Sequence, residues 1–302
     1  MNHPLRFGII TLQYLSWPTL VEHWKAIEAL GYDSVWIADH FVTNPVKDAW
    51  YDGWTLLAAL ATLTSTVRIG TLVTNFIYRN PAVIAKQAMT VDHISQGRLE
   101  LGIGATSRRD LSHRMLGIEN WSEAERVQRF REVIEIVDQM LRQEETTYAG
   151  RYYQVTQAAM RPSPMQKPRP PLTIAAHGPT TLKIAAQFAD SWNSYGDFNA
   201  SPAETLAITR QRSEMLDEYC LKIGRNPFEV RRSFLAGLSA DRPFASLEAF
   251  YDFVGSYHEI GISEFIFYYD TTDFEPDQCM DRAMLERIAS EAIPAIRAKE
   301  SS

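Results

Sequence analysis

The sequence predicts an α/β protein, a (β/α)₈ TIM barrel with insertions at the carboxyl ends of its strands. Strand-like and helix-like segments alternate at roughly thirty residues per unit, and about eight such units fit in the 302 residues. The strand-like segments are nearly continuous apolar runs, as expected for a buried parallel sheet. An open doubly wound sheet is the alternative. We disfavour it because no Gly-x-Gly-x-x-Gly turn follows the first strand.

The first half of the chain contains four of these units. Gly31 is a helix stop, and Pro81 is a favourable residue for the first turn of a helix. We expect strands at 6–11, 34–38, 67–74 and 98–104, and helices at 18–30, 54–63, from residue 81 onward and at 121–141.

The regular alternation stops after the fourth unit and then resumes. Residues 146–155 are expected to form a hairpin with Gly150 in its turn, and five prolines lie between Arg161 and Pro171. We interpret residues of about 105–120 and 144–170 as insertions in one domain that spans residues 1–302. The expected later elements are strands at 171–176, 191–193, 230–236 and 263–269, and helices from residue 180 and at 202–223, 247–260 and 280–298.

Composition limits the classes of partner. The net charge of −7 disfavours binding to nucleic acid. No apolar run reaches the roughly 18 residues that would span a bilayer, and the first residues lack a signal-peptide pattern. Cys220 and Cys279 match neither a metal-site spacing nor a disulfide framework. We therefore expect a cytoplasmic protein without a bound metal, and no nucleic-acid or membrane partner.

The second expected strand delivers an acid and an imidazole to its carboxyl end, as Asp39 and His40. Active sites of (β/α)₈ barrels lie at this end of the strands. An imidazole titrates near neutral pH, so His40 is the best general acid or base in the chain. The alternative is that Asp39 only orients or caps and that His40 packs under a loop. The position at a strand end favours the catalytic interpretation.

The third and fourth strands end in residues suited to a planar ligand. Leu72 and Val73 end one strand, and Thr74 and Asn75 follow with groups that form hydrogen bonds, whereas Asn80 is expected to cap a helix. Gly104 and Ala105 end the next strand and leave room for a ligand beside the backbone. The neighbouring Arg108 and Arg109 could contact a phosphate or carboxylate, or form a solvated charge pair.

The fifth strand runs into small residues and then a helix, an arrangement that can cradle a phosphate on backbone N–H groups. Gly-Pro before a helix is also ordinary punctuation, so the pattern alone is weak. The residues expected to contact a cofactor here are Ala175, Ala176, His177, Gly178, Pro179 and Thr180. The chain lacks a Gly-x-Ser-x-Gly elbow, a Walker loop and a His-Glu-x-x-His motif, which favours an oxidoreductase that takes its chemistry from a bound cofactor.

Four segments together carry a family resemblance: "EALGYDSVWIADHF", "VRIGTLVTNFIYRNPAVIAKQAMTVDHISQGRLELGIGA", "YAGRYY" and "PRPPLTIAAHGPTTLKIAAQFADSWN". In order and spacing the chain resembles the luciferase-like flavin and deazaflavin oxidoreductases of the bacterial luciferase superfamily. The resemblance is detailed over roughly residues 5–200. It implies a TIM barrel, a homodimer, and a cofactor across the carboxyl face of the barrel, either FMN or the deazaflavin coenzyme F420.

The forms "WIADH" and "AAHGPTT" look more like the deazaflavin branch. In that branch the histidine that matches His40 sits beside the reactive ring. The peptide that matches Leu72–Val73 is a non-proline cis bond supporting the ring. Two departures stand out: Ala105 and Asn44 replace a glutamate and a tryptophan of the sugar-phosphate dehydrogenases, which puts a sugar-phosphate substrate in doubt. FMN enzymes place an arginine near Ala105, so FMN is disfavoured unless Arg108 or Arg109 substitutes.

Three functions remain open on this basis. The first is hydride transfer between F420 and a small organic molecule. The second is an FMN-dependent monooxygenase that uses reduced flavin and O₂. The third is a flavin-binding barrel without catalysis. Aromatic residues suggest an apolar or planar substrate, although each taken singly fits the core as well: Trp50, Trp54, Phe76, Trp192, Tyr195 and Tyr268.

Overall fold

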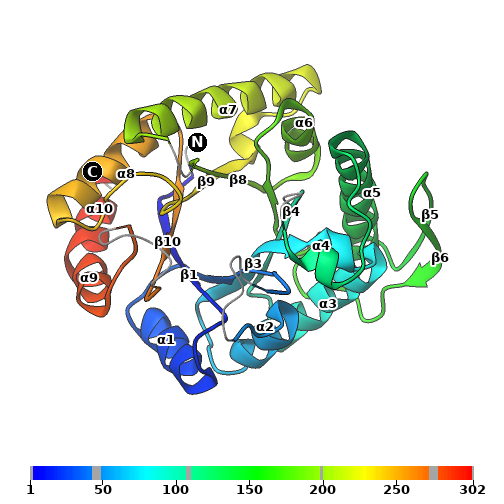
Figure 1. Ribbon diagram of the computed structural model, residues 1–302, viewed down its shortest axis with the longest axis horizontal. Helices are drawn as coiled ribbons and strands as arrows, with labels where there is room; N and C mark the ends of the chain where they lie inside the picture. Colours follow the sequence, from blue (N-terminus) through cyan, green and yellow to red (C-terminus); the bar gives the residue numbers. More distant parts are fainter. Residues whose placement is uncertain (1–2, 43–48, 107–109, 198–199, 272–277, 301–302) are drawn as a thin grey trace. The chain divides into compact units, whose positions relative to one another are not determined.

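The computed structural model describes residues 3–42, 49–106, 110–197, 200–271 and 278–300 (Figure 1). The strands are β1 Arg6–Thr11, β2 Ser34–Ile37, β3 Arg68–Asn75, β4 Leu99–Gly104, β5 Glu145–Ala149, β6 Gln154–Ala159, β7 Leu172–Ala175, β8 Ser191–Tyr195, β9 Arg231–Leu235 and β10 Glu264–Tyr268. The helices are α1 Trp17–Ala29, α2 Gly53–Ala61, α3 Pro81–Ile94, α4 Ser112–Met115, α5 Glu123–Arg142, α6 Pro179–Phe188, α7 Pro202–Lys222, α8 Leu247–Glu259, α9 Arg282–Arg287 and α10 Ile293–Glu300.

Eight strands close into one barrel in the order β1-β10-β9-β8-β7-β4-β3-β2, and β5 pairs with β6 in a separate sheet. The predicted (β/α)₈ barrel is therefore confirmed. By internal packing the chain divides into two compact units. Unit 1 comprises Met1–Leu12, Glu22–Trp36 and Ala176–Ser302, and unit 2 comprises Gln13–Val21 and Ile37–Ala175.

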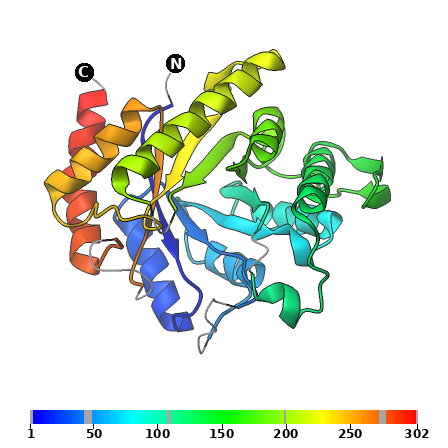
Figure 2. The same cartoon turned by 45° about the horizontal axis from the view of Figure 1, so that its top comes forward.

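In unit 2 the parallel strands β3, β4 and β7 are adjacent, and α2, α3 and α5 lie outside them (Figure 1). The caps follow from local chemistry: the side chain of Asp52 accepts from Thr55 N at the start of α2, and Asn80 accepts from Ala82 N at the start of α3. The prediction for Asn80 is thus confirmed. The antiparallel hairpin β5–β6, also as predicted, lies on the outer side of α5 (Figure 2).

In unit 1 the strands β1, β10, β9 and β8 are adjacent and parallel, and α7 and α8 cover them from outside (Figure 1). The inner face of α8 is aromatic, and the ring of Phe253 lies 6.2 Å from that of Phe267 on β10 and 6.2 Å from that of Phe234 on β9. Burying such large side chains stabilises this layer.

Two elements differ from the sequence prediction. β8 extends to Tyr195 rather than ending at residue 193, because its polar residues are buried but paired: Asn193 Nδ2 donates to Ser233 Oγ over 3.0 Å. The helix expected over 280–298 is divided into α9, a π-helical turn Ile288–Ala292 and α10. Pro294, in the first turn of α10, has no N–H to donate to the preceding turn, which interrupts the regular ladder.

No helix in the described ranges combines the length and the apolar character that crossing a membrane requires.

Candidate functional site

Asp39 follows β2 and is buried, with 1% of its surface exposed. Its carboxylate accepts a hydrogen bond from Asn75 N over 3.0 Å and forms an ion pair with Arg79. Arg79 also pairs with Asp52 over 2.9 Å. The Tyr78 hydroxyl donates to the backbone oxygen of Asp39. Asp39 therefore fastens the end of β2 to the segment that leaves β3.

Burial raises the pKa of Asp39 to about 6, against the lowering effects of the Arg79 guanidinium and the Asn75 N–H group. A carboxyl group with this pKa is mostly ionised at pH 7. The Arg79 guanidinium and the Asn75 N–H group partly offset the cost of burying the charge.

His40, the next residue, has a different environment. Its side chain is 49% exposed, and its Nδ1 lies 3.2 Å from Asp110 Oδ2. Its backbone oxygen accepts from Trp50 Nε1 over 2.7 Å. Among the described residues Nε2 has no hydrogen-bond partner. With Nδ1–H donating to a carboxylate, Nε2 is the nitrogen that can exchange a proton with a ligand.

Asp110 is buried and well satisfied. It accepts from Ser112 N over 2.8 Å and from Asn75 Nδ2 over 3.2 Å, in addition to His40. Burial alone would raise the pKa of Asp110, but hydrogen bonds from His40 and Ser112 outweigh it and lower the pKa to about 2. The carboxylate is a permanent anion beside the imidazole. Its contact with Nδ1 fixes the orientation of the ring.

The ends of β3 and β4 meet beside this pair. The Leu72–Val73 peptide bond is cis, which confirms the expectation drawn from the family resemblance. The register between β3 and β4 shifts between Thr71 and Thr74. A Cβ placed on Gly104 would lie 2.5 Å from Val73 Cγ2, so only glycine fits opposite that side chain. Ala175 pairs with Gly104 on the other side.

The polar side chains at the end of β3 form hydrogen bonds with other groups of the protein. Thr74 Oγ1 lies 2.8 Å from Thr71 Oγ1, inside the sheet. Asn75 Oδ1 accepts from Ile77 N and from Thr106 Oγ1, both over 3.1 Å. The two side chains thus support the ends of the strands. Arg108, Arg109 and Asn44 lie outside the described residues.

A cavity of about 680 Å³ opens beside the Asp39 contacts, lined in part by Phe41, Tyr78, Arg79, Trp121 and Tyr153. Its walls mix aromatic and aliphatic side chains with polar and charged ones, among them Asp52 and two arginines, Arg79 and Arg129, that already form ion pairs. Arg129 lies over the rings of Trp121 and Tyr152 at 4.2 and 4.3 Å and pairs with Glu125. A cavity of this size and character is typical of small-molecule sites.

The predicted phosphate cradle lies at the start of α6, in unit 1. Gly178 is the N-cap, and its N–H donates to Thr181 Oγ1 over 3.2 Å. Gly178, Pro179 and Thr180 are exposed. The neighbouring His177 has a buried Nε2 without a partner, and burial lowers the pKa of this imidazole to about 3. The helix start is accessible, and beside it is a neutral imidazole.

The sequence missed several residues of the His40 region. These are Asp110 and Arg79, although each lies next to a residue that the sequence does indicate: Asp110 follows Arg108 and Arg109, and Arg79 precedes the helix cap Asn80. A search for partners of a strand-end histidine and aspartate, an acid and a base in neighbouring strand-end loops, could have found both. Of the aromatic candidates, four are core residues and only Trp50 and Tyr195 are partly exposed; the buried four are Trp54, Phe76, Trp192 and Tyr268.

The comparisons with known proteins agree on one family. The model of a family described as luciferase-like monooxygenase matches residues 3–271. An F420-dependent glucose-6-phosphate dehydrogenase of Microbacterium testaceum is 33% identical over 241 residues, which cover 76% of this chain and 67% of that protein. A 5,10-methylenetetrahydromethanopterin reductase of Archaeoglobus fulgidus is 28% identical over 238 residues, covering 79% of this chain and 65% of the relative. The match thus spans about two thirds of the length of these relatives.

Solved structures share the fold at low identity. The coenzyme F420 dependent tetrahydromethanopterin reductase from Methanopyrus kandleri superposes with a TM-score of 0.77 at 19% identity, covering 97% of this chain and 100% of that one. An F420-dependent secondary alcohol dehydrogenase, solved with an F420–acetone adduct, gives 0.79 at 18% identity, covering 97% and 99%. The monooxygenase RslO1 from Streptomyces bottropensis gives 0.69 at 19%, covering 96% and 99%.

Proposed function

Because the chain belongs to the luciferase-like monooxygenase family, we propose that it is an oxidoreductase that transfers hydride between coenzyme F420 and a small organic substrate. The observation that carries the proposal is the His40–Asp110 pair at the end of β2, half-exposed on the imidazole side and anchored on the carboxylate side. Similarity to relatives named as F420-dependent dehydrogenases supports the choice of cofactor.

The residues of unit 2 fit a flat, uncharged ring. The ends of β3 and β4 offer backbone and the apolar side chain of Val73, and Gly104 leaves that surface free of a side chain. Among the described residues at these strand ends, His40 is the titratable group with an open position. When bound, F420 supplies the carbon that carries the hydride. The protein has to bind the ring, orient the substrate and move a proton.

His40 performs the proton transfer in this proposal. Oxidation of a substrate alcohol releases a proton from its hydroxyl as the hydride leaves, and Nε2 takes that proton. Reduction of a carbonyl runs the same transfer backwards, with the protonated imidazole giving its proton to the carbonyl oxygen. Asp110 holds Nδ1–H and stabilises the positive charge while His40 carries the extra proton.

We also propose that the start of α6 contributes contacts to an anionic part of the cofactor. The residues are Ala176, His177, Gly178, Pro179 and Thr180, with oriented N–H groups at the helix start. His177 is neutral, so it can donate or accept a hydrogen bond there through its unpartnered Nε2. A homodimer, implied by the family resemblance, belongs to the same proposal.

The substrate that we propose differs in class from the one for which several relatives are named. Several relatives are named for glucose 6-phosphate, but Ala105 stands where that group carries a glutamate. Aromatic and aliphatic side chains form most of the cavity wall beside Arg79, including Phe41, Tyr78 and Trp121. We therefore propose a substrate with an apolar or planar body and one alcohol or carbonyl group.

Cofactor binding tests this proposal directly. The purified protein is titrated with F420 and, separately, with FMN, and the dissociation constants are measured from the fluorescence of each cofactor. We expect F420 to bind at least about tenfold more tightly, a difference of roughly 1.4 kcal/mol. Tighter binding of FMN would support the monooxygenase alternative, and failure to bind either would contradict both.

A further inference from the structure

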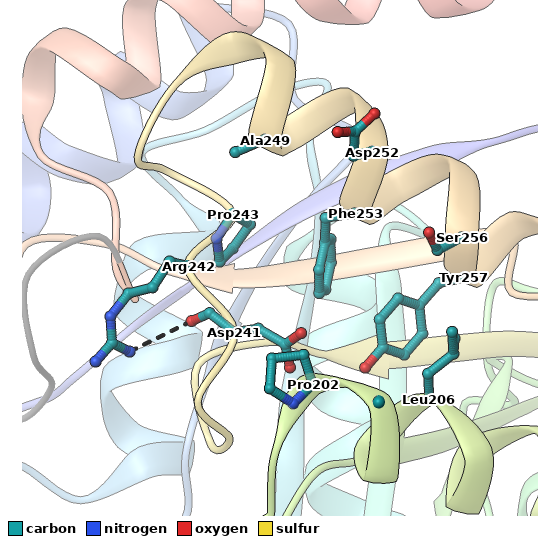
Figure 3. A pocket seen from close by; sticks show the side chains of 11 residues that line it. Pro202, Leu206, Asp241, Arg242, Pro243, Ala249, Asp252, Phe253, Ser256 and Tyr257 are labelled. Atoms are coloured by element: carbon teal, nitrogen blue, oxygen red, sulfur yellow. Dashed lines mark hydrogen bonds between the residues drawn. The ribbon is translucent and has the colours of Figure 1, made fainter.

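A second cavity, of about 380 Å³, lies within unit 1 and shares no lining residue with the His40 region. It opens between the start of α7, the segment after β9 and the length of α8 (Figure 3). Pro202 and Leu206 come from α7, Asp241 and Pro243 from the segment after β9, and Phe253 from α8. The volume is within the range of sites for small organic molecules.

One wall of this cavity carries a buried hydroxyl without a partner. Tyr257 is only 2% exposed, and among the described residues its hydroxyl has no hydrogen-bond partner. In Figure 3 the ring of Tyr257 faces the same space as Asp241, with its hydroxyl turned toward Pro202 and Leu206. A buried hydroxyl without a hydrogen bond is unfavourable, so this group is available to a ligand.

The opposite wall carries a buried carboxylate. Asp241 is 6% exposed, and its carboxylate accepts a hydrogen bond from Ser239 Oγ. No cationic side chain in the described ranges forms an ion pair with it. The adjacent Arg242 donates to the backbone oxygen of Asp241 instead, over 3.5 Å, and its side chain extends away from Tyr257 (Figure 3). Burial raises the pKa of Asp241, against the lowering effects of the Ser239 hydroxyl and, to a smaller extent, of the Arg242 charge.

Most of the remaining wall is apolar or aromatic, and the other polar lining residues, Arg242, Asp252 and Ser256, are exposed. The rings of Phe253 and Tyr257 lie 4.7 Å apart at 39°, and Pro202, Leu206 and Pro243 close the other sides. An ammonium group suits this combination because it has three donors for the Asp241 carboxylate and the Tyr257 oxygen, and because aromatic rings attract cations. The apolar walls suit a short hydrocarbon body.

We propose that this cavity is a binding site for a small organic amine, whose ammonium group is held between Asp241 and Tyr257 and whose apolar body lies against Phe253, Leu206 and the two prolines. The ligand is distinct in chemistry from the anionic cofactor and from the substrate proposed above. A small alcohol is the competing occupant, since one hydroxyl can accept from Tyr257 and donate to Asp241.

Two probes of the same shape separate these occupants. Benzylamine and benzyl alcohol are titrated into the full-length protein at low ionic strength and near-neutral pH, and binding is followed by calorimetry and ligand-observed NMR. We expect saturable binding of benzylamine at one site and binding of benzyl alcohol at least tenfold weaker. Equal affinity for the two probes, or no saturable binding of benzylamine, overturns the proposal.

Three variants place the binding in this cavity. We expect Asp241→Asn to weaken benzylamine binding at least tenfold and Tyr257→Phe, which keeps the ring, about fivefold through one lost hydrogen bond. Asp252→Asn is the matched control, because Asp252 also lines the cavity but is exposed, and its loss should change affinity less than threefold. Equal effects of Asp241→Asn and Asp252→Asn would indicate attraction to surface charge alone and would overturn the proposal. Should Asp241→Asn not fold, Tyr257→Phe and the comparison of the two probes still decide.

Discussion

His40 and Asp110 meet although they are 70 residues apart in sequence, and each has a different task. The half-exposed imidazole is placed to exchange a proton, and the buried carboxylate holds it in one orientation. Asp39, directly before His40, is buried, and its Oδ2 is held by Asn75 and Arg79. In the proposed function, Asp39 is therefore a structural residue and His40 the residue that takes part in the chemistry.

Replacing His40 should affect the chemical step and leave binding largely intact. We expect His40→Ala to lower kcat by about 10²–10⁴-fold, with little change in the affinity for F420. Asp110→Asn should also lower kcat, by a smaller factor, because the imidazole remains but loses its anionic partner. His93→Ala, which removes a partly exposed imidazole bonded to the backbone oxygen of Ser163, is the control and should retain full turnover. Unchanged turnover of His40→Ala would reduce His40 to a packing residue.

Asp39 predicts a specific dependence of stability on pH. Its pKa is raised from 3.8 to about 6 in the folded protein, so the folded state binds the proton more tightly than the unfolded state. The stabilisation from the protonated form is fully present below about pH 4 and is lost as the pH rises through about 6. The free energy of unfolding of the parent protein minus that of Asp39→Asn should therefore fall between pH 4 and 7.

Urea denaturation of both proteins at intervals across this range measures the difference. A difference that grows with pH would show that the ion pair with Arg79 outweighs the desolvation of Asp39.

At the scale of elements, the ends of β3 and β4 form a surface that tolerates no added side chain at Gly104. A Cβ there would meet Val73 Cγ2 at 2.5 Å, which the neighbouring strand can relieve only by moving. We expect Gly104→Ala to destabilise the protein by about 1–3 kcal/mol and to weaken cofactor binding. Gly255→Ala is the control: a Cβ there has nothing within 4 Å, and alanine favours the helix α8. Equal unfolding free energies for the two variants would contradict this account.

The start of α6 predicts the opposite pattern. A Cβ at Gly178 meets only Thr181 Oγ1, at 3.9 Å, so Gly178→Val should fold as well as the parent. The bulkier side chain would cover the exposed N–H groups of the helix start, and we expect weaker binding of F420 with an unchanged melting temperature. If the affinity is unchanged, the anionic part of the cofactor binds elsewhere.

At the scale of the whole molecule, the barrel and the order of its elements could be read from the sequence. Apolar runs such as 34–37 and 99–104 are strong signals because both faces of a parallel strand are buried. The sequence does not predict the end of β8, because Asn193 and Ser194 are polar but buried. Their hydrogen bonds are made with Ser233 and Arg212, which are distant in sequence. The break at Ile288–Ala292 was missed because it depends on one proline within a helical pattern.

The candidate site, like the fold, could be predicted from the sequence in part. Position in the barrel predicts His40 as the acid or base, which stays a prediction, and family resemblance correctly predicted the cis peptide at Leu72–Val73. Asp110 and Arg79 belong to loops, where no periodic pattern reports which residue turns toward the site. The cavity between α7 and α8 had no local signal, since its two polar groups, Asp241 and Tyr257, come from different elements.

The central claim is that the protein moves hydride to or from F420 with His40 as its proton carrier. Its most direct test is turnover without O₂. Reduced F420 is mixed with the protein and with each of a panel of aromatic and aliphatic ketones and aldehydes. The absorbance of oxidised F420 then reports reoxidation of the coenzyme. We predict reoxidation by at least one carbonyl compound without O₂, with a rate that falls about 10²-fold or more in His40→Ala. Turnover that occurs only with reduced FMN and O₂, with no anaerobic reaction of F420, would contradict the account.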